Sequence, residues 1–496
     1  MSPGAVDLDR TAHEHADALR SGEYTAVELA AATVDRLRRQ DEALHAYIAI
    51  EEERALADAA LADEALREGE GGPLTGVPVA LKDLIATAGL QTTAASRILE
   101  GYVPAEDATV AARLRRAGAV VVGKANLDEF AMGSSTEHSA YGPTLNPWDL
   151  DRVPGGSSGG SAATVAARGV PLALGTDTRG TIRQPAALTG IVRLKPPYGR
   201  VSRYGVVAFA SSLEQVGPFG RDAEDVANLL AAIAGLDPRD STTAPEPVPD
   251  YLPELGRGLD GLSVAVPDAF FEGAEEGVVE AVEAALDVLE ANGARLVRGV
   301  DLSLAPAALP AYYLIAPAEA SANLARYDGV KYGAGDTGGP GLWDEMERTR
   351  GAGFGPEVKR RIMLGTYALS AGYYDAYYLK AQRVRTLIRE EFDRALAGHD
   401  LIVSPTTPGP AFRLGERVDD PWAMYLSDLY TIPANIVGYP AVSMPCGFVE
   451  GLPVGLQMLG RPFAEGTLLR ATAAYQAVTD WHGRSPPVPD EAGRAP

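Results

Sequence analysis

The chain has 496 residues and 46% hydrophobic composition, which is enough to bury a large core, and its length alone would allow roughly two to four domains. A formal charge of −23 argues against this chain by itself attracting nucleic acid or an anionic membrane. The single cysteine, Cys446, excludes an internal disulfide and a multi-cysteine zinc site, and the six scattered histidines form no metal-ligand pattern, so we predict no structural metal.

The first 70 residues are predicted to form a helical segment that packs on the core. Residues 7–19 and 25–38 have helical spacing, and Thr25 with Glu28 forms a capping-box pattern. A short strand over 45–50 and a helix over 51–68 follow. A turn and a buried strand come next and end at Lys82, and a lysine at the end of an otherwise apolar run is unusual.

Helices and strands alternate over the middle of the chain. Helices are predicted at 106–118, 158–168, 222–235 and 276–292, and strands at 119–123, 170–174, 262–266 and 294–298, with 184–188 continuing the alternation. The stretch 236–261 is rich in Pro, Asp and Thr and is predicted to be an excursion or linker. The alternation predicts an α/β fold with helices on both faces of a sheet.

The last third of the chain is predicted to complete the same domain. A helix over 307–326 should be kinked or interrupted by Pro310 and Pro317. We predict a Gly-rich surface loop at 333–355, two helices within 356–397 that meet near 370–372, strands at 401–404, 441–444 and 454–459, and a helix at 466–479. The expected organisation is therefore an α/β domain over 71–482 and a mobile tail over 483–496.

Two loops rich in Gly, Ser and Thr lie in the stretch 154–186, each just before an apolar or Ala-rich run. Loops of this kind lead into helix N-termini, where unpaired backbone N–H groups favour negative charge. A pair of flexible Gly/Ser linkers is the alternative, and it is less favoured because ordered-looking segments flank each loop. The stretch is suited to holding an oxyanion.

Lys82, Ser157 and Thr181 are the candidate catalytic group. A lysine acts as a base only when neutral, and burial lowers its pKa in that direction. A serine can relay a proton from a hydroxyl nucleophile to the lysine. Backbone N–H groups of the second loop would form the oxyanion hole, at Thr178, Arg179 and Gly180. On residue types alone, a surface lysine and ordinary turn hydroxyls are an equally good interpretation.

Six sequence runs carry a resemblance to a known family. The runs 76–83, 155–163 and 177–185 resemble the amidase signature family, and the runs 132–137, 146–150 and 198–205 resemble, within it, the glutamyl-tRNA(Gln) amidotransferase A subunits. The resemblance covers nearly the whole chain and implies one large α/β domain with a mixed central sheet surrounded by helices. It also implies a triad in which Lys82 is the base, Ser157 the bridging cis-serine and Thr181 the nucleophile.

The same resemblance implies a glutamine site. Segments 311–316, 358–362 and 426–430 match the family, and by that match Tyr312, Arg361 and Asp428 bind glutamine. This is chemically sensible, because Arg361 can fork onto the α-carboxylate and Asp428 can pair with the α-ammonium. Taken singly, each residue would more often form a salt bridge on a helix surface.

The implied function is a glutaminase subunit that releases ammonia for converting Glu-tRNA(Gln) to Gln-tRNA(Gln). The resemblance implies a heterotrimer with B and C subunits, tRNA held mainly by a partner subunit, and ATP and Mg²⁺ used by that partner, with no cofactor on this chain. The acidic charge agrees with this division of labour. We expect a cytoplasmic protein without membrane contact, since neither a signal pattern nor a run of about 18 apolar residues occurs.

The chain departs from the family at Arg179, Thr181, Arg193 and Pro197, where the family has Gly, Ser, Gly and Thr. The methyl group of Thr181 must fit a close-packed site and restricts χ1, so we expect a slower reaction. Arg179 could block the ammonia route and would be strained if its position requires a positive φ, whereas Arg193 would have to escape a buried strand. Two alternatives remain: a stand-alone amidase for other small amides, and a non-catalytic scaffold subunit.

Overall fold

A mixed β-sheet runs through the molecule, and the computed structural model describes it within residues 6–336 and 338–487. Over these residues eleven strands pair in the order β1-β3-β2-β4-β6-β5-β10-β11-β9-β7-β8. The strands are β1 Tyr47–Ile50, β2 Pro78–Lys82, β3 Val120–Ala125, β4 Leu172–Asp177, β5 Val192–Lys195, β6 Gln215–Gly220, β7 Ser263–Val266, β8 Arg295–Arg298, β9 Leu401–Pro405, β10 Ala441–Val449 and β11 Leu452–Gly460. The predicted fold class, a single large α/β domain with a mixed central sheet, is confirmed.

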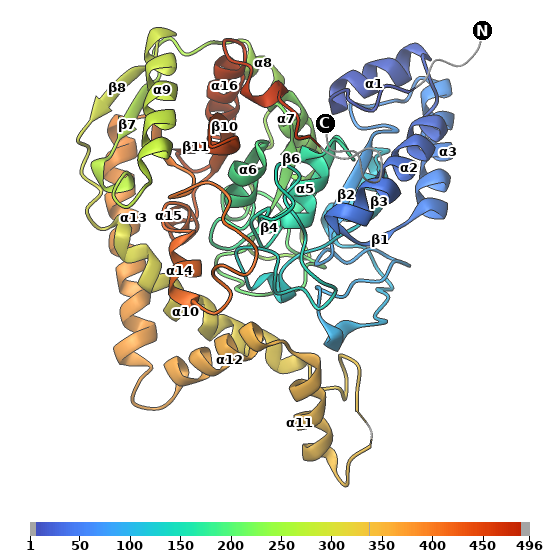
Figure 1. Cartoon of the computed structure of the whole chain (residues 1–496), viewed down its shortest axis with the longest axis vertical. Coiled ribbons are helices and arrows are strands. Elements are labelled where there is room, and N and C mark those ends of the chain that lie inside the picture. The colour runs from blue at the N-terminus through green and yellow to red at the C-terminus, as the bar shows by residue number, and fades with distance from the viewer. Residues whose placement is uncertain (1–5, 337, 488–496) are drawn as a thin grey trace.

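Helices surround the sheet on both faces (Figure 1). They are α1 Ala12–Ser21, α2 Ala26–Leu44, α3 Glu52–Glu68, α4 Thr109–Arg116, α5 Gly159–Ala166, α6 Arg183–Thr189, α7 Ala223–Ile233, α8 Leu252–Leu255, α9 Glu276–Ala291, α10 Ala308–Asn323, α11 Leu342–Gly353, α12 Pro356–Leu369, α13 Lys380–Gly398, α14 Pro421–Leu426, α15 Ile432–Val437 and α16 Glu465–Gln476. Across the residues described, no helix combines the length and apolar character that crossing a bilayer requires.

Strand direction changes along the sheet. β2 pairs in parallel with β3 and β4, and β7 pairs in parallel with β8 and β9, whereas the strands between β4 and β9 pair antiparallel. β10 and β11 form a hairpin whose two-residue turn, Glu450 and Gly451, has φ values of 51° and 80°. Two positive φ values in a two-residue turn match the twist of antiparallel strands.

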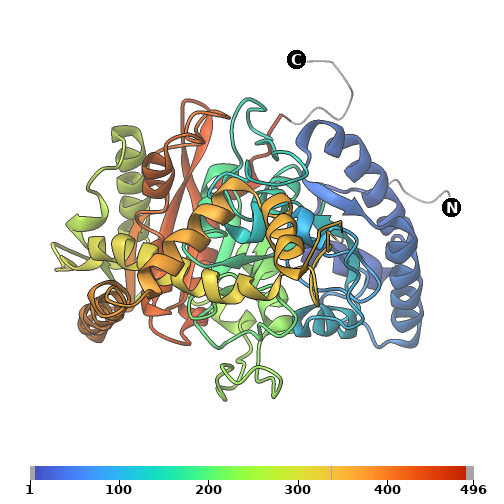
Figure 2. The same cartoon turned by 90° about the horizontal axis from the view of Figure 1, so that it is seen from below.

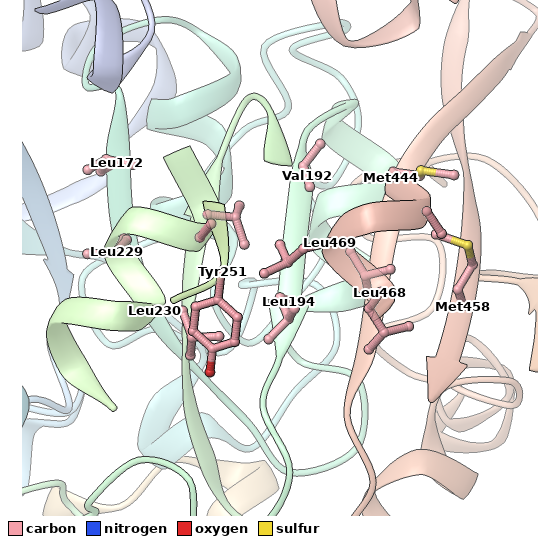
Figure 3. Close-up of a cluster of buried hydrophobic side chains, with 14 of the residues drawn as sticks. Leu172, Val192, Leu194, Leu229, Leu230, Tyr251, Met444, Met458, Leu468 and Leu469 are labelled. Carbon is pink, nitrogen blue, oxygen red and sulfur yellow. The ribbon is translucent and has the colours of Figure 1, made fainter. Parts of the chain in front are cut away.

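Alternate strand residues face opposite sides of the sheet, and this alternation places the candidate base. Val79 and Leu81 of β2 join a large apolar cluster beneath α7, α9 and α16. Figure 3 shows this cluster, with Leu468 and Leu469 of α16 packed towards Val192 and Leu194 of β5. Lys82, one residue beyond Leu81, therefore faces the other side of the sheet, towards α5 and α6.

The N-terminal segment continues the sheet as well as covering it. β1 pairs antiparallel with β3 at one edge, and α2 packs against α3 and β3 (Figure 1). The predicted capping box at the start of α2 is present, since the Glu28 N–H donates to Thr25 Oγ1 and the Thr25 N–H donates to Glu28 Oε2. Helical propensity, capping and the edge strand together fix this segment on the core.

Three predictions about single segments are wrong. Residues 333–355 contain α11, because the run from Leu342 to Arg350 is rich in helix formers and has Asp344 and Glu345 in its first turn, where the helix dipole favours them. The predicted interruption at Pro317 does not occur, since α10 continues through this residue. Arg193 does not escape β5; its side chain is fully buried.

Arg193 stays inside because the adjacent strand offers it a partner on that face. Its guanidinium carbon lies 3.5 Å from the ring centroid of Phe219, and Nη2 donates to the Gly217 carbonyl at 2.5 Å. Its Nε and Nη1 have no partner within the part of the chain that the structure describes, and burial lowers the pKa of Arg193 well below its ordinary value. Most of the predicted mobile tail, residues 488–496, lies outside the described residues.

Candidate active site

Lys82 lies at the carboxyl end of β2, beside the carboxyl end of its parallel neighbour β4. Its Nζ atom is 2.8 Å from Ser157 Oγ, 2.9 Å from Ser158 Oγ and 3.0 Å from Thr176 Oγ1. All four side chains are buried. The structure therefore brings Lys82 and Ser157 together, as the sequence predicted, and surrounds the amine with hydroxyl groups.

Burial lowers the pKa of Lys82 from 10.5 to about 7, although Asp128 and Glu214 act in the opposite direction. A buried ammonium loses its hydration, and hydroxyl contacts do not replace the countercharge it would need. Near neutral pH, a substantial fraction of Lys82 is the free amine, which is the form that can accept a proton.

Ser157 lies on the loop that leads into α5, and its peptide bond with Gly156 is cis. The Asp128 N–H donates to the Ser157 carbonyl oxygen at 3.2 Å. Asp128 also draws in a neighbouring loop, because its carboxylate accepts from the N–H groups of Ser135 and Thr136. A Cβ at Gly156 would lie 2.3 Å from Asp128 Oδ2, so only glycine fits beside this carboxylate.

Thr181 lies between β4 and α6, close to the Ser157 loop. The Ser158 N–H donates to the Thr181 carbonyl at 3.1 Å, which joins the two loops. The Thr181 hydroxyl donates to the Thr176 carbonyl at 2.8 Å and accepts from the Thr178 N–H at 3.3 Å. Among the hydrogen bonds of the described residues, none joins Thr181 Oγ1 to Ser157 Oγ. The predicted catalytic residues thus occupy one buried region, with the threonine hydroxyl turned towards β4.

In the predicted oxyanion loop, some backbone N–H groups already donate hydrogen bonds within the protein and others do not. The Gly180 N–H donates to Asp177 Oδ1 at 2.6 Å, whereas no hydrogen bond within the described residues uses the N–H of Arg179 or Thr181. The positive φ of the loop is at Gly180, at +122°, where a Cβ would lie 2.0 Å from Thr431 Oγ1. Arg179 is not among the residues with positive φ, so the backbone strain considered for it does not arise.

A buried ion pair holds this loop in place. Arg183 Nε lies 3.0 Å from Asp177 Oδ2, and the Asn435 side-chain amide donates to Asp177 Oδ1 at 2.9 Å. Although burial opposes ionisation, Arg183 holds the pKa of Asp177 below its ordinary value. A charged Asp177 can therefore anchor the Gly180 N–H and the start of α6 together.

The three predicted substrate-binding residues come from separate elements and gather near the oxyanion loop. Tyr312 is on α10, Arg361 is on α12, and Asp428 lies between α14 and α15, and all three are fully buried or nearly so. Arg361 Nε donates to Glu357 Oε1 at 2.7 Å, and its guanidinium lies 5.9 Å from the Tyr313 ring centroid. Several of their polar atoms lack a partner among the described residues: Tyr312 OH, Arg361 Nη1 and Nη2, and Asp428 Oδ1.

Arg179 connects the oxyanion loop to these residues. Its Nε atom lies 3.0 Å from Asp428 Oδ2, and its Nη groups donate to the hydroxyls of Tyr313 and Ser134. The Ser134 hydroxyl donates to Asp428 Oδ2 at 2.6 Å. Burial raises the pKa of Asp428 to about 6, with Arg179 acting against that rise.

The sequence reasoning missed several contributors to this site. Ser134 and Tyr313 lie within segments that carried the family resemblance, so their positions were a signal without an assigned role. Ser158 lies within the run 155–163 in the same way, whereas Asp128 and Glu357 had no distinguishing pattern. These residues hold loops, hydroxyls and Arg361 in place, which only the assembled fold reveals.

One group of three side chains has metal-ligand spacing within the described residues: His13, Asp222 and Asp225. The sequence showed no metal-ligand pattern around any histidine, whereas His13 Nδ1 lies 3.0 Å from Asp225 Oδ1. The Asp225 carboxylate accepts the backbone N–H groups of Ala12 and His13. These contacts show that the group links the start of α1 to the start of α7.

Comparison with known proteins adds independent information. The family model described as Amidase matches residues 28–469. The chain is 57% identical over 476 residues to the A subunit of the glutamyl-tRNA(Gln) amidotransferase of Roseiflexus sp. (strain RS-1), covering 96% of this chain and 97% of that protein. The same subunit from Thermotoga maritima has a crystal structure that is 44% identical with a TM-score of 0.82, covering 98% and 99% of the two chains. The native peptide amidase from Stenotrophomonas maltophilia is 32% identical with a TM-score of 0.82, covering 97% and 98%.

Proposed function

The chain belongs to the amidase family, and from that premise we propose that it is the glutaminase subunit, known as the A subunit, of a glutamyl-tRNA(Gln) amidotransferase. It releases ammonia from glutamine for the conversion of Glu-tRNA(Gln) to Gln-tRNA(Gln). The observation that carries the proposal is the 2.8 Å contact between Lys82 Nζ and Ser157 Oγ in a buried site next to Thr181. Relatives that bear the subunit's name and are 57% identical over nearly the full chain support the choice of reaction.

The proposed chemistry begins with proton transfer away from Thr181. The Thr181 hydroxyl first gives up its hydrogen bond to the Thr176 carbonyl and turns towards Ser157. As Thr181 Oγ1 attacks the side-chain amide carbon, it transfers its proton to Ser157 Oγ, and Ser157 passes its own proton to neutral Lys82. The developing oxyanion accepts from the free N–H groups of Arg179 and Thr181. Lys82 returns the proton through Ser157 to the leaving nitrogen, the C–N bond breaks, and ammonia leaves. Water then hydrolyses the Thr181 ester by the same proton route, giving glutamate.

The remaining roles follow from charge. Arg361 offers both Nη atoms to the α-carboxylate of glutamine, with Tyr312 as a neighbouring hydroxyl donor. Asp428 would pair with the α-ammonium. We further propose that the chain works in the cytoplasm in a heterotrimer with B and C subunits. The partner that binds tRNA uses ATP and Mg²⁺ to activate the glutamyl end and receives the ammonia.

A non-catalytic scaffold subunit is the second candidate. It is favoured by one observation, the hydrogen bond of the Thr181 hydroxyl to the Thr176 carbonyl in place of Ser157. A threonine has restricted χ1, so its hydroxyl needs a rotation against close packing before it can join Ser157.

Glutamine-dependent ammonia release by the chain assembled with its B and C subunits tests the proposal. We expect slow release by the unaltered chain, roughly tenfold faster release by Thr181→Ser, and a loss of about a hundredfold or more on Lys82→Ala in either background. If the Thr181→Ser variant releases ammonia and the unaltered chain does not, the scaffold candidate is favoured. If the complex assembles and Thr181→Ser combined with Arg179→Gly still releases no ammonia, the glutaminase proposal is wrong.

A further inference from the structure

Asp428 gives one of its two carboxylate oxygens to the protein and leaves the other free. Oδ2 accepts the Ser134 hydroxyl at 2.6 Å and lies 3.0 Å from Arg179 Nε, whereas Oδ1 is buried without a hydrogen-bond partner among the described residues. The contact with Arg179 is an ion pair without hydrogen-bond alignment, because Nε also has no hydrogen-bond partner there. Buried carboxylate oxygens are usually satisfied, so Oδ1 marks the place of a donor that a ligand supplies.

Unpaired donors lie in the same region. Arg361 is held at Nε by Glu357, at 2.7 Å, and its Nη1 and Nη2 are buried without an acceptor in the part of the chain that the structure describes. The guanidinium carbons of Arg361 and Arg179 each lie 5.9 Å from the ring centroid of Tyr313, so both cations border one ring. The free atoms are therefore one acceptor and a planar pair of donors, which suit an ammonium and a carboxylate.

The fixed charges around these atoms cancel. Arg361 is paired with Glu357, Arg179 is paired with Asp428, and all four side chains are buried. A buried site without net charge favours a ligand without net charge, because an excess charge there has neither water nor a counterion. Glutamine is a zwitterion and keeps this balance. A neutral residue at position 179 would leave Asp428 as a buried carboxylate without its cation.

We propose that the Arg179 side chain is a positioning residue for glutamine: it holds Asp428 Oδ2 and leaves Oδ1 as a charged acceptor for the α-ammonium. The ammonium completes the partners of the carboxylate without displacing the guanidinium. This inference rests on the proposed glutaminase function. It gives a use to Arg179, one of the positions at which the chain departs from the family.

The ionisation of Asp428 gives this role a pH signature. Burial raises the pKa of this carboxyl to about 6, and Arg179 acts most strongly against the rise, followed by the Ser134 hydroxyl. Glutamine should lose affinity as the pH falls through 6, because a protonated carboxyl cannot pair with the ammonium. Without the charge at position 179 the pKa of Asp428 should rise by roughly one to two units, so the loss of affinity should begin at a higher pH.

The other charged and titratable groups around Asp428 come from three elements. They are Asp177 of β4, Arg361 and Glu357 of α12, and Tyr312 and Tyr313 of α10. Although burial opposes their ionisation, Asp177 and Glu357 have pKa values that arginine partners hold below the ordinary range. Burial raises the pKa of Tyr312 to about 12 and that of Tyr313 well above its ordinary value. These groups therefore keep their charge state near pH 6.

Titration calorimetry of the full chain with glutamine between pH 5 and 8.5 tests the inference. The parent protein is the Thr181→Ala variant, which cannot attack the amide and leaves glutamine intact. We expect its Kd to be constant above roughly pH 7 and to rise about tenfold per pH unit below the midpoint near 6. Arg179→Gln in this background should move the midpoint up by roughly one to two pH units. Its Kd should be about fivefold or more higher at pH 6, and within about threefold of the parent at pH 8.5.

Two further variants ask whether the charge at position 179 is responsible. Arg179→Lys keeps a cation beside Asp428, so its midpoint should lie closer to that of the parent than to that of Arg179→Gln. Ser134→Ala removes the other donor to Oδ2 and should also move the midpoint upward, which provides a second test if Arg179→Gln does not fold.

Arg193→Gln is the matched control, since it removes another fully buried arginine that forms no ion pair with Asp428 or Glu357 within the described residues. His138→Gln is a second control, because this histidine lies near Glu357. The midpoint should stay near 6 in both. The inference is overturned if the parent does not bind glutamine at pH 7, or if the midpoint stays near 6 in every folded variant at positions 179 and 134. It is also overturned if Arg179→Gln weakens binding equally at all pH values, as a purely structural change would.

Ammonia release by the Arg179 variants with Thr181 restored, assembled with the B and C subunits, separates the two proposals. If the midpoints for glutamine binding move as expected and no complex releases ammonia, even with Thr181→Ser, the glutaminase proposal fails and the role of Arg179 in binding stands. If ammonia is released and the midpoint does not respond to position 179, the role of Arg179 fails and the glutaminase proposal stands.

Discussion

At the scale of single residues, the protonation of Lys82 sets the pH at which the site can work. Burial lowers the pKa of this lysine to about 7, and only the neutral amine can take a proton from Ser157. Below that pH the ammonium form dominates and the rate should fall about tenfold per pH unit. Above it the rate should level off.

We therefore expect kcat/KM of the Thr181→Ser complex to rise with pH to a plateau, with a midpoint near 7. Lys195→Met is the control, since burial also lowers the pKa of Lys195 to about 7, although this lysine donates to the Pro196 carbonyl and, among the described residues, forms no hydrogen bond with the triad. Its removal should leave the midpoint in place. A profile that is flat between pH 6 and 8 would exclude Lys82 as the base.

Individual residues also show what could be predicted from sequence. The apolar run before Lys82 indicated burial and a lowered pKa, and both are present in the structure. Arg193 follows a similar apolar run, and its predicted escape was wrong because the sequence did not reveal that Phe219 of β6 would lie against it. The partners of Arg179 were equally hidden, since Asp428 is far away along the chain and is brought close only by folding.

At the scale of elements, the substrate side of the site depends on how closely α10 and α12 pack. Gly365 of α12 lies against the backbone of α10, where an added Cβ would come within 1.8 Å of the Pro317 carbonyl oxygen. Tyr312 and Arg361 are carried by these same two helices. Figure 2 shows α10 and α12 crossing the middle of the molecule when it is seen from below.

Gly365→Ala should therefore force the two helices apart. We expect the free energy of unfolding to fall by about 3 kcal/mol, as in other overpacked cores, and the KM for glutamine to rise because Arg361 moves with α12. Gly351→Ala on the exposed face of α11 is the control: a Cβ there meets nothing within 4 Å, and the change should be neutral or stabilising by about 0.5–1 kcal/mol. Urea unfolding measures the stability of both variants, and equal stability of the two would contradict close packing at Gly365.

Elements with mixed signals were the hardest to predict. Residues 333–355 read as a loop because glycines surround a short run of helix formers, although α11 needs only that run and the contacts of Arg350 with the carbonyls of Leu324 and Tyr327. β6 contains Pro218, which argues against a central strand, yet it lies between β4 and β5. The long amphipathic helices and apolar strands were recognisable because their periodicity extends over more residues.

At the scale of the whole molecule, the N-terminal segment and the candidate site share one sheet. β1 protects the outer edge of β3, and β3 in turn pairs with β2, the strand that carries Lys82. The apolar face of α2 joins one buried cluster with residues of α5, and Leu29, Val34 and Leu37 of α2 are exposed by 1% or less. α5 begins directly after the Ser157 loop, so the same contacts support both the sheet edge and the site.

A chain that starts at residue 71 should therefore lose more than a covering layer. It would expose the edge of β3 together with the apolar surface beneath α2, and an unprotected strand edge next to apolar surface promotes aggregation. We expect this chain to be insoluble when produced alone, and to become soluble when residues 1–70 are produced beside it as a separate polypeptide. Sedimentation and thermal unfolding are measured for the shortened chain alone and for the shortened chain with residues 1–70. If the shortened chain instead remained monomeric with an unchanged Tm, the N-terminal segment would be an independent addition, and the continuity of the sheet through β1 would contribute nothing to the stability of the site.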